Sequence, residues 1–204
     1  MPVPLRPPDI PRVNAATLDV AELTVGRLLR IGPARFPSLV YFGREAQYRF
    51  DAPDGSYGVM YAALDFTTCF AEVLLRDSLL ADPKPTLFES DLARLVVATF
   101  GPVRRRLRLA RLLGAMPNLG IDAQISTYHD YCVTQARSKA LHEHPSSVDG
   151  LLFASRMNSP ALSVAIFERA SKGLRERDRV AVLSHPGFKA IAAIPGLTVV
   201  PDQS

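Results

Sequence analysis

The sequence has few cysteines and no long apolar run, which excludes two broad classes of protein. No stretch of about 18 uncharged apolar residues occurs among its 204 residues, so we expect no transmembrane span. Prolines interrupt the N-terminal stretch MPVPLRPPDIPRV, which lacks the apolar segment of a signal peptide. The two cysteines, Cys69 and Cys132, both fall in predicted helices, and we expect reduced, buried thiols in a cytoplasmic protein.

The common phosphate-binding, zinc-binding and hydrolase motifs are also missing. Neither G-x-x-x-x-G-K-S/T nor G-x-G-x-x-G after a strand occurs in the chain. His142 and His144 lie two residues apart, which matches no zinc-site spacing, so no metal site is expected. Ser155 is not in a G-x-S-x-G turn, and no acidic residue and histidine follow it in hydrolase order.

Positive charge is in mild excess. The 24 basic and 20 acidic residues give a net charge of +4, which is too small to indicate nucleic acid but is compatible with an anionic small-molecule ligand. The run RRRLRLARLL predicts a basic amphipathic helix over residues 104–113. No aromatic residues interleave with its arginines, so a solvated face or a protein contact is favoured over nucleic-acid binding.

The hydrophobic patterns predict one α+β domain of residues 25–204, preceded by a proline-rich arm and a short helix within residues 1–24. The arm covers residues 1–14, the short helix residues 15–22, and residues 32–47 form a loop. Predicted strands cover residues 25–31, 48–51, 58–64, 94–100, 150–155, 162–167 and 179–183. Further helices start at Asp65 or Thr67, at residue 104 and at residue 126, the last ending at His142, and residues 188–200 are ambiguous.

Glu72 lies in the middle of the predicted apolar helix that follows strand 58–64. On the 3.6-residue period of a helix, the side chain of Glu72 points away from those of Phe66 and Phe70. A carboxylate in apolar surroundings is costly unless something pairs with it or uses it. One interpretation is a salt bridge to Arg76, four residues later. The other is a functional carboxylate.

Two arginines, one tyrosine and one serine can also each be interpreted either as structural or as functional residues. Arg30 and Arg49 lie in or beside apolar strands, where the planar guanidinium usually meets a carboxylate or a phosphate. Such a carboxylate could belong to the chain itself. Tyr61, in a buried strand, fits a core position or a ligand platform, and Ser155, at a strand end, fits a turn or a site residue.

Taken together, these segments resemble the RES domain family over roughly residues 25–170. The resemblance is carried, in order, by the segments LLRIG (28–32), YRFDAP (48–53), GVMYAA (58–63), TCFAE (68–72), TQA (134–136), DGLLFASR (149–156) and VAIFE (164–168). It implies a mixed, strongly bent sheet similar to that of ADP-ribosyltransferases.

The resemblance also implies a function. Such proteins are NAD-cleaving toxins of bacterial toxin–antitoxin pairs, which break the nicotinamide–ribose bond with phosphate or water as acceptor. The implied partner is an Xre-like helix-turn-helix antitoxin. No direct contact with nucleic acid or a membrane is implied, and self-association into a homo-oligomer is left open. ADP-ribosyl transfer to a protein or nucleic acid, and a non-catalytic interaction module, remain the alternatives.

By the same resemblance, Arg30, Glu72 and Ser155 are the catalytic residues, and Arg49 and Tyr61 join them in binding NAD. Ser126 is an alternative to Ser155 as the family serine. NAD is then a substrate, inorganic phosphate is a candidate co-substrate, and no metal is required. The arginines would hold the pyrophosphate, and Glu72 would stabilise the oxocarbenium-like ribose.

Overall fold

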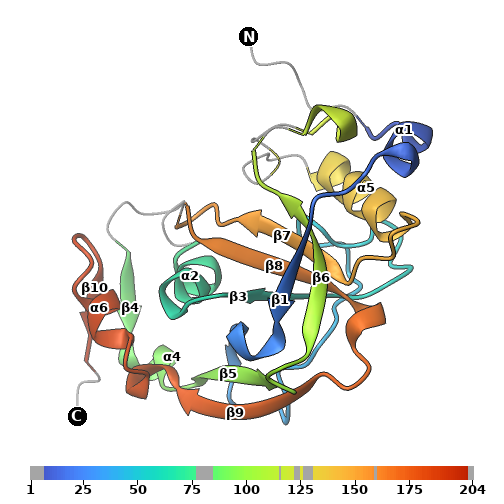
Figure 1. The fold of residues 1–204 in the computed structure, drawn as a ribbon. Coiled ribbons are helices and arrows are strands. Elements are labelled where there is room, and N and C mark those ends of the chain that lie inside the picture. Colours follow the sequence, from blue (N-terminus) through green and yellow to red (C-terminus); the bar gives the residue numbers. More distant parts are fainter. Residues whose placement is uncertain are drawn as a thin grey trace.

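A mixed sheet of eight strands runs through the protein in the order β1-β6-β7-β8-β3-β2-β5-β9 (Figure 1). This computed structural model describes residues 7–76, 85–114, 116–121, 125, 131–158 and 160–201. The strands are Val20–Thr24 (β1), Leu29–Pro33 (β2), Val59–Ala63 (β3), Leu95–Gly101 (β5), Arg106–Leu112 (β6), Gly150–Ala154 (β7), Leu162–Phe167 (β8) and Arg175–Ala181 (β9). Only β6 and β7 pair in parallel, and every other neighbouring pair is antiparallel.

Short helices and a second, two-stranded sheet surround the main sheet. The α-helices are Ile10–Ala15 (α1), Phe66–Phe70 (α2), Glu89–Leu92 (α4), Tyr131–His142 (α5) and Phe188–Ala192 (α6). A π-helical turn, Ala71–Leu75 (η2), continues α2 directly. The 3-10 turns are Val25–Arg27 (η1), Pro117–Leu119 (η3), Glu168–Ala170 (η5) and Val182–Ser184 (η6). Strands Thr86–Phe88 (β4) and Thr198–Val200 (β10) form the small parallel sheet.

The eight-stranded sheet bends strongly on itself. Five strands separate β1 from β5 in the sheet order, yet Leu23 of β1 and Phe100 of β5 belong to the same buried cluster. That cluster also holds Leu107 of β6 and Ile166 of β8, so one face of the sheet forms a common core. Figure 1 shows β1 and β6 crossing over β3 and β8 in this view. The predicted α+β domain with a mixed, bent sheet is confirmed.

The other face of the sheet is covered in two places. One cluster packs α1 and α5 against β3, β7 and β8 through residues such as Val13, Leu141 and Phe167. A second packs α2, η2 and α6 against β2, β3 and β5 through residues such as Phe70 and Ile191. The carboxyl end of β7 lies near α2 in Figure 1.

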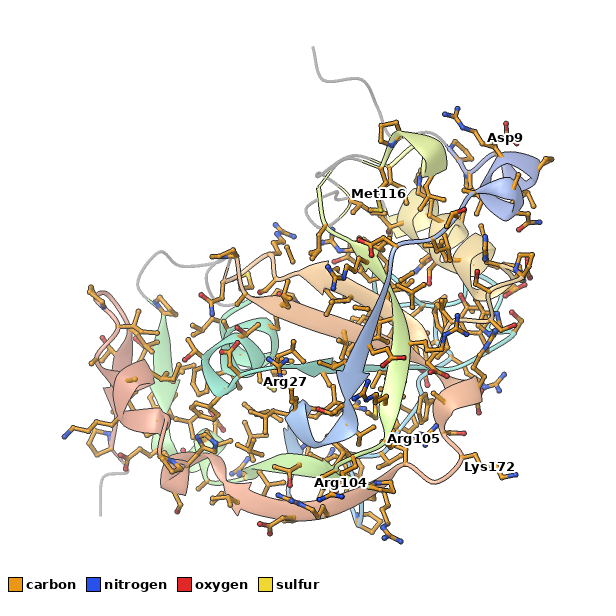
Figure 2. The ribbon with its side chains drawn as sticks, viewed as in Figure 1. Asp9, Arg27, Arg104, Arg105, Met116 and Lys172 are labelled. Carbon is orange, nitrogen blue, oxygen red and sulfur yellow. The ribbon has the colours of Figure 1, made fainter. Side chains whose placement is uncertain are left out.

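The helix predicted for residues 104–113 is wrong, because these residues form β6. Arg106 and Arg108 are exposed whereas Leu107 and Leu109 are fully buried, which is the two-residue alternation of a half-buried strand. Several of these arginines hold neighbouring segments. Arg105 donates from Nη1 and Nη2 to carbonyl oxygens of the segment that contains Lys172, which lies nearby in Figure 2.

The N-terminal predictions are wrong in two places. The expected extended arm contains α1, which Asp9 caps by accepting the N–H of Arg12 at 3.3 Å. The helix expected over residues 15–22 is replaced by β1, an edge strand paired with β6. The strand expected over residues 25–31 divides into η1 and β2, and residues 48–51 form turns and bends instead of a strand.

The central predictions are confirmed. Strands lie within residues 58–64, 150–155 and 162–167, β5 matches the strand expected at 94–100 to within one residue at each end, and α5 ends at His142 as expected. The strand expected at 179–183 overlaps the end of β9, while the ambiguous residues 188–200 contain α6 and β10. Both cysteines lie in helices and neither forms a disulfide, but Cys132 is exposed, so the expectation that it is buried is wrong. None of the helices within the described ranges has the length and apolar character needed to cross a membrane.

Gly150 opens the strand that leads to Ser155, and the sheet has no room for a side chain there. A Cβ at this position would lie 2.2 Å from the carbonyl oxygen of Ala165 in β8. We expect Gly150→Ala to destabilise the fold by at least about 3 kcal/mol, the upper end for overpacking, because backbone must move. For a chain of this length that lowers the Tm by roughly 6–12 °C.

Differential scanning calorimetry measures this shift. Gly101→Ala is the matched control, since its Cβ would meet nothing nearer than 3.8 Å. Equal Tm values for the two variants would contradict the packing argument.

Candidate active site

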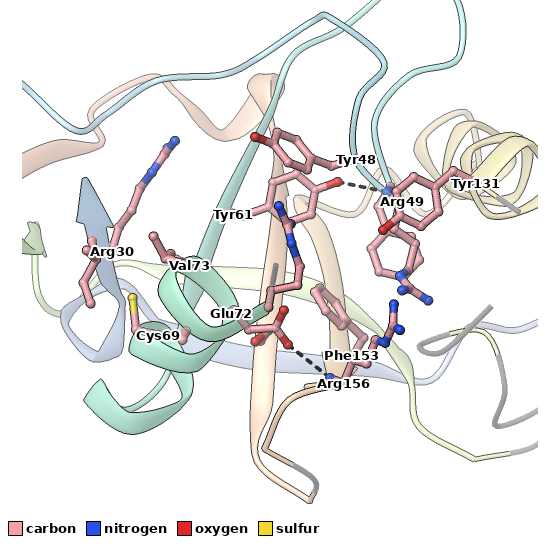
Figure 3. Close-up of a pocket in the computed structure, with 16 residues that line it drawn as sticks. Arg30, Tyr48, Arg49, Tyr61, Cys69, Glu72, Val73, Tyr131, Phe153 and Arg156 are labelled. Carbon is pink, nitrogen blue, oxygen red and sulfur yellow. Dashed lines mark hydrogen bonds between the residues drawn. The ribbon is translucent and has the colours of Figure 1, made fainter. Parts of the chain in front are cut away.

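A cavity of about 290 Å³ opens beside α2 and η2, over the ends of β2 and β3 (Figure 3). Its walls combine charged, aromatic and apolar side chains. The lining residues are Arg30, Ile31, Tyr48, Arg49, Phe50, Tyr61, Ala62, Ala63, Cys69, Glu72, Val73, Arg76, Tyr131, Phe153, Arg156 and Ser163. The same cavity is therefore lined by four of the predicted site residues, Arg30, Arg49, Tyr61 and Glu72.

Glu72 is positioned by hydrogen bonds from the loop after β7. Its Oε1 accepts the hydroxyl of Ser155 at 2.6 Å and the backbone N–H of Arg156 at 3.1 Å. Glu72 itself lies in the π-helical turn η2, a geometry that occurs frequently at functional sites. Within the described residues, no hydrogen-bond donor contacts Oε2, so this second oxygen of a cavity-lining residue can still accept a hydrogen bond.

The helix that carries Glu72 is attached to the same loop at a second point. Asp65 caps α2 by accepting both the N–H of Thr68 at 2.8 Å and its hydroxyl at 2.7 Å. The hydroxyl oxygen of Thr68 in turn accepts Nδ2 of Asn158 at 2.8 Å. These contacts fix α2 relative to β7, and thereby fix the direction of the Glu72 carboxylate.

Ser155 supports Glu72 and does not belong to the residues that line the cavity. It is 2% exposed, and its hydroxyl oxygen accepts the N–H groups of Met157 and Asn158 while its proton goes to Glu72. The role of Ser155 as a catalytic residue stays a prediction, and in this structure its hydroxyl donates to the Glu72 carboxylate. Ser126, the alternative serine, lies outside the described residues.

Arg30 forms one end of the cavity. Its Nη1 donates to the carbonyl oxygen of Tyr41 at 2.8 Å, and burial lowers its pKa. Figure 3 shows Arg30 beside Cys69 and Val73, on the opposite side of η2 from Arg156. Burial also raises the pKa of the Cys69 thiol to about 12, so this thiol is not a nucleophile.

Tyr61 is held by its hydroxyl group, which leaves its ring as the accessible part. The hydroxyl donates to Oδ1 of Asp51 at 2.9 Å and accepts the N–H of Phe50 at 2.9 Å. Burial raises the pKa of Tyr61 well above its usual value and also raises the pKa of Asp51. The ring of Tyr48 packs edge-on against Tyr61, with 5.6 Å between centroids.

The sequence reasoning missed four residues of the cavity wall. Arg76 lies over the ring of Tyr48 at 5.4 Å, although the sequence suggested a pair with Glu72. Tyr131 lies under Arg49 at 5.3 Å. Arg156 follows Ser155 directly, and Tyr48 precedes Arg49 directly, each within a segment that carries the family resemblance, so these two residues had a usable signal.

The cavity is strongly basic. Four of its lining residues are arginines and one, Glu72, is acidic. Within the described ranges, no group of three or more His, Cys, Asp or Glu side chains is arranged to hold a metal ion. The arrangement suits an anionic organic ligand whose reacting part meets a single carboxylate.

A scan against protein families matches the RES domain over residues 27–186, which is most of the chain. The chain belongs to the RES domain family. No curated protein sequence matches the chain significantly. Among solved structures, the chain is similar to one in the crystal structure of the M. tuberculosis MbcT–MbcA toxin–antitoxin complex. The TM-score is 0.58 and the identity 18%, over 84% of this chain and 90% of that one, so the two share a fold.

We expect Tyr61→Phe to destabilise this RES domain by about 1–3 kcal/mol at neutral pH, because Asp51 and the N–H of Phe50 both lose a partner. The loss should be smaller near pH 4. The pKa of Asp51 is raised in the folded protein, so folding favours its protonated form, and a neutral carboxyl group tolerates the missing donor better.

Urea unfolding at pH 7 and pH 4 measures both values. Tyr57→Phe is the control, since the hydroxyl of Tyr57 makes only a 3.4 Å contact with Ser138. An equal loss of stability for Tyr61→Phe at the two pH values would contradict this account of Asp51.

Proposed function

We propose that this RES domain protein is a toxin that cleaves NAD at the nicotinamide–ribose bond, with phosphate or water as acceptor. The observation that carries the proposal is the position of the Glu72 carboxylate, held by Ser155 and Arg156 on the wall of a cavity that four arginines line. Family membership and the likeness to a chain of a toxin–antitoxin complex support it.

The arginines match the charge of the proposed substrate. NAD carries its negative charge on the pyrophosphate, and a guanidinium group satisfies two phosphate oxygens at once. Arg30 is attached to the carbonyl oxygen of Tyr41 through Nη1 only, so other donors of its fork remain for a ligand. Aromatic rings of Tyr48 and Tyr61 on the same wall offer faces for a nicotinamide or adenine ring.

Glu72 matches the charge that the reaction develops. When the glycosidic bond breaks, its electron pair leaves with the nicotinamide ring, which becomes neutral and needs no general acid. Positive charge then grows on the ribose, and a fixed carboxylate stabilises it. In this proposal Oε2 accepts a ribose hydroxyl, while Oε1 accepts hydrogen bonds from Ser155 and Arg156.

The alternative of a non-catalytic interaction module has less support. It would be favoured if the predicted site residues were scattered, whereas Arg30, Arg49, Tyr61 and Glu72 line one cavity. ADP-ribosyl transfer to a macromolecule uses the same residues with a different acceptor, and the identity of the products distinguishes it.

We expect the purified protein to consume NAD and release nicotinamide. Mass spectrometry of the products, with and without inorganic phosphate, identifies the acceptor. ADP-ribose-1″-phosphate formed only with phosphate indicates a phosphorylase, free ADP-ribose indicates a hydrolase, and ADP-ribose attached to an added macromolecule indicates a transferase. No consumption of NAD by folded protein freed of bound inhibitor would refute the proposed activity.

Glu72→Gln should lower the rate of nicotinamide release by about 10²–10³, equivalent to roughly 3–4 kcal/mol, because the amide carries no charge to stabilise the ribose. The fold should persist, since a Gln Oε1 still accepts the Ser155 hydroxyl and the Arg156 N–H. We expect an unchanged or higher Tm.

The matched control is Glu89→Gln, which removes the same charge at the start of α4, outside the cavity. It should release nicotinamide at the parental rate. A Glu72→Gln protein as active as this control would exclude Glu72 from the chemistry.

We also propose an antitoxin partner with an Xre-like helix-turn-helix domain, which inserts a segment near the cavity. The partial support is a loop between β2 and β3 that exposes Phe36 (45%) and Tyr41 (55%), the second of which contacts Arg30 through its carbonyl. Phe42, in the same loop, is half-buried against the core.

Expression of the chain without its partner should slow bacterial growth in proportion to the loss of cellular NAD. Colorimetric NAD assays along a growth curve, with the Glu72→Gln variant at matched expression as the control, measure the relation. Normal growth in cells that contain active, soluble parent protein would contradict the toxin proposal.

A further inference from the structure

Two side chains of the edge strand β9, Glu176 and Arg179, hold the loop between β2 and β3 (Figure 1). Nη1 and Nη2 of Arg179 donate to the carbonyl oxygens of Phe36 and Pro37 at 3.0 and 2.9 Å. Nε of Arg179 donates to Oε1 of Glu176, whose Oε2 accepts the N–H of Leu39 at 2.7 Å. Together, the two side chains therefore bind three backbone groups of this loop.

A β-bulge brings these two side chains to the same face of β9. Residues three apart on a regular strand point to opposite faces of the sheet. Here Arg179 lies opposite Ala98 of β5 and Glu176 lies opposite Phe100, so three residue steps on β9 match two on β5. Bulges redirect side chains in this way and are frequent next to active sites. Glu176 and Arg179 can therefore act as one unit, which we call the loop clamp.

Arg30 contacts the same loop from the other side of β5. It lies opposite Ala98 on β2, just as Arg179 lies opposite Ala98 on β9. Both arginines therefore project from one face of the sheet, two strand spacings or about 10 Å apart. Nη1 of Arg30 donates to the carbonyl oxygen of Tyr41 at 2.8 Å. The loop thus contacts two arginines of one face, of which Arg30 lines the cavity.

Leu39 connects the two sets of contacts. Its N–H is bound by Glu176, and its buried side chain packs directly over β2, because a Cβ on Gly32 would lie 2.8 Å from Cδ2 of Leu39. Gly32 follows Arg30 by two residues and lies on the same face of the strand. A shift of Leu39 therefore carries the Tyr41 carbonyl, two residues later, away from Arg30.

We propose that Glu176 and Arg179 are positioning residues for Arg30. By holding the loop, they keep the Tyr41 carbonyl where it occupies one donor of the Arg30 guanidinium and leaves the other donors for a ligand. This rests on the proposed cleavage of NAD, in which Arg30 binds the pyrophosphate. Glu72 is fixed by separate contacts from the loop after β7. The loop clamp therefore controls substrate binding and leaves the chemical step nearly unchanged.

Arg179→Ala and Glu176→Gln test the loop clamp in two ways. The first removes both hydrogen bonds to the loop carbonyl oxygens. The second keeps the shape of the side chain, but both partners of Glu176 are N–H donors, so the amide NH₂ of a glutamine must face one of them. Arg175→Ala, which removes an exposed charge from the same strand, is the control. Circular dichroism establishes that each variant is folded.

NMR spectroscopy of ¹⁵N-labelled protein without NAD tests the positioning independently of turnover. In both clamp variants we expect the amide hydrogen of Leu39 to exchange about tenfold faster or more, the loss expected for a hydrogen bond to a charged group. The Nε–H signal of Arg30, assigned by its absence in Arg30→Lys, should shift or broaden. Neither should change in Arg175→Ala. Unchanged exchange at Leu39, or faster exchange with an unchanged Arg30 signal, overturns the proposal.

Steady-state kinetics then tests what the positioning does. Both clamp variants should raise the KM for NAD about tenfold while kcat changes less than about threefold. In an Arg30→Ala background, Arg179→Ala should raise the KM no further, because the clamp acts through Arg30. A further tenfold increase there, or a lower kcat with an unchanged KM, overturns the proposal. If the parent never consumes NAD, the proposed function fails, and the NMR result alone decides whether the clamp positions Arg30.

Discussion

The hydrogen bond between Ser155 and Glu72 joins the two halves of the site. Ser155 follows β7 and Glu72 lies after β3, and these strands reach the same cavity only because β8 pairs with both of them. The bond fixes one oxygen of a carboxylate that lines the cavity. A hydrogen bond to an ionised group contributes roughly twice as much as a neutral one, which suits it to this task.

The excess of positive charge around that carboxylate is electrostatically unfavourable for the folded chain. Arg30 and Arg49 are buried enough for their pKa values to fall, and Arg49 also lies near Arg156. Such an arrangement is typical of a binding site: the repulsion lowers the stability of the folded protein, and a negatively charged ligand gains binding free energy by relieving it. Two separate groups of arginines in one cavity therefore suit a substrate with two anionic parts, or two anionic substrates.

Some of this could be predicted from the sequence, and some could not. Short apolar runs predicted the strands β3, β7 and β8. The ordered segments around Arg30, Glu72 and Ser155 indicated the RES domain family. The alternation RLRLARL predicts a strand by its period of two, but the run of three arginines at residues 104–106 suggested a basic helical face, and the helix prediction was wrong. Tyr131 could not be found, since its place beside Arg49 depends on how α5 packs against the sheet. The π-helical turn around Glu72 likewise has no local sequence signal.

The central claim is that Ser155 acts through Glu72, and a double-mutant cycle tests it most directly. The rate of nicotinamide release is measured for the parent, Ser155→Ala, Glu72→Gln and the double variant. The account predicts that Ser155→Ala slows the parent about tenfold, which is the loss of one charge-assisted hydrogen bond, but leaves the rate of the Glu72→Gln protein unchanged. A tenfold loss from Ser155→Ala in both backgrounds would contradict it, because Ser155 would then act on the substrate independently of Glu72.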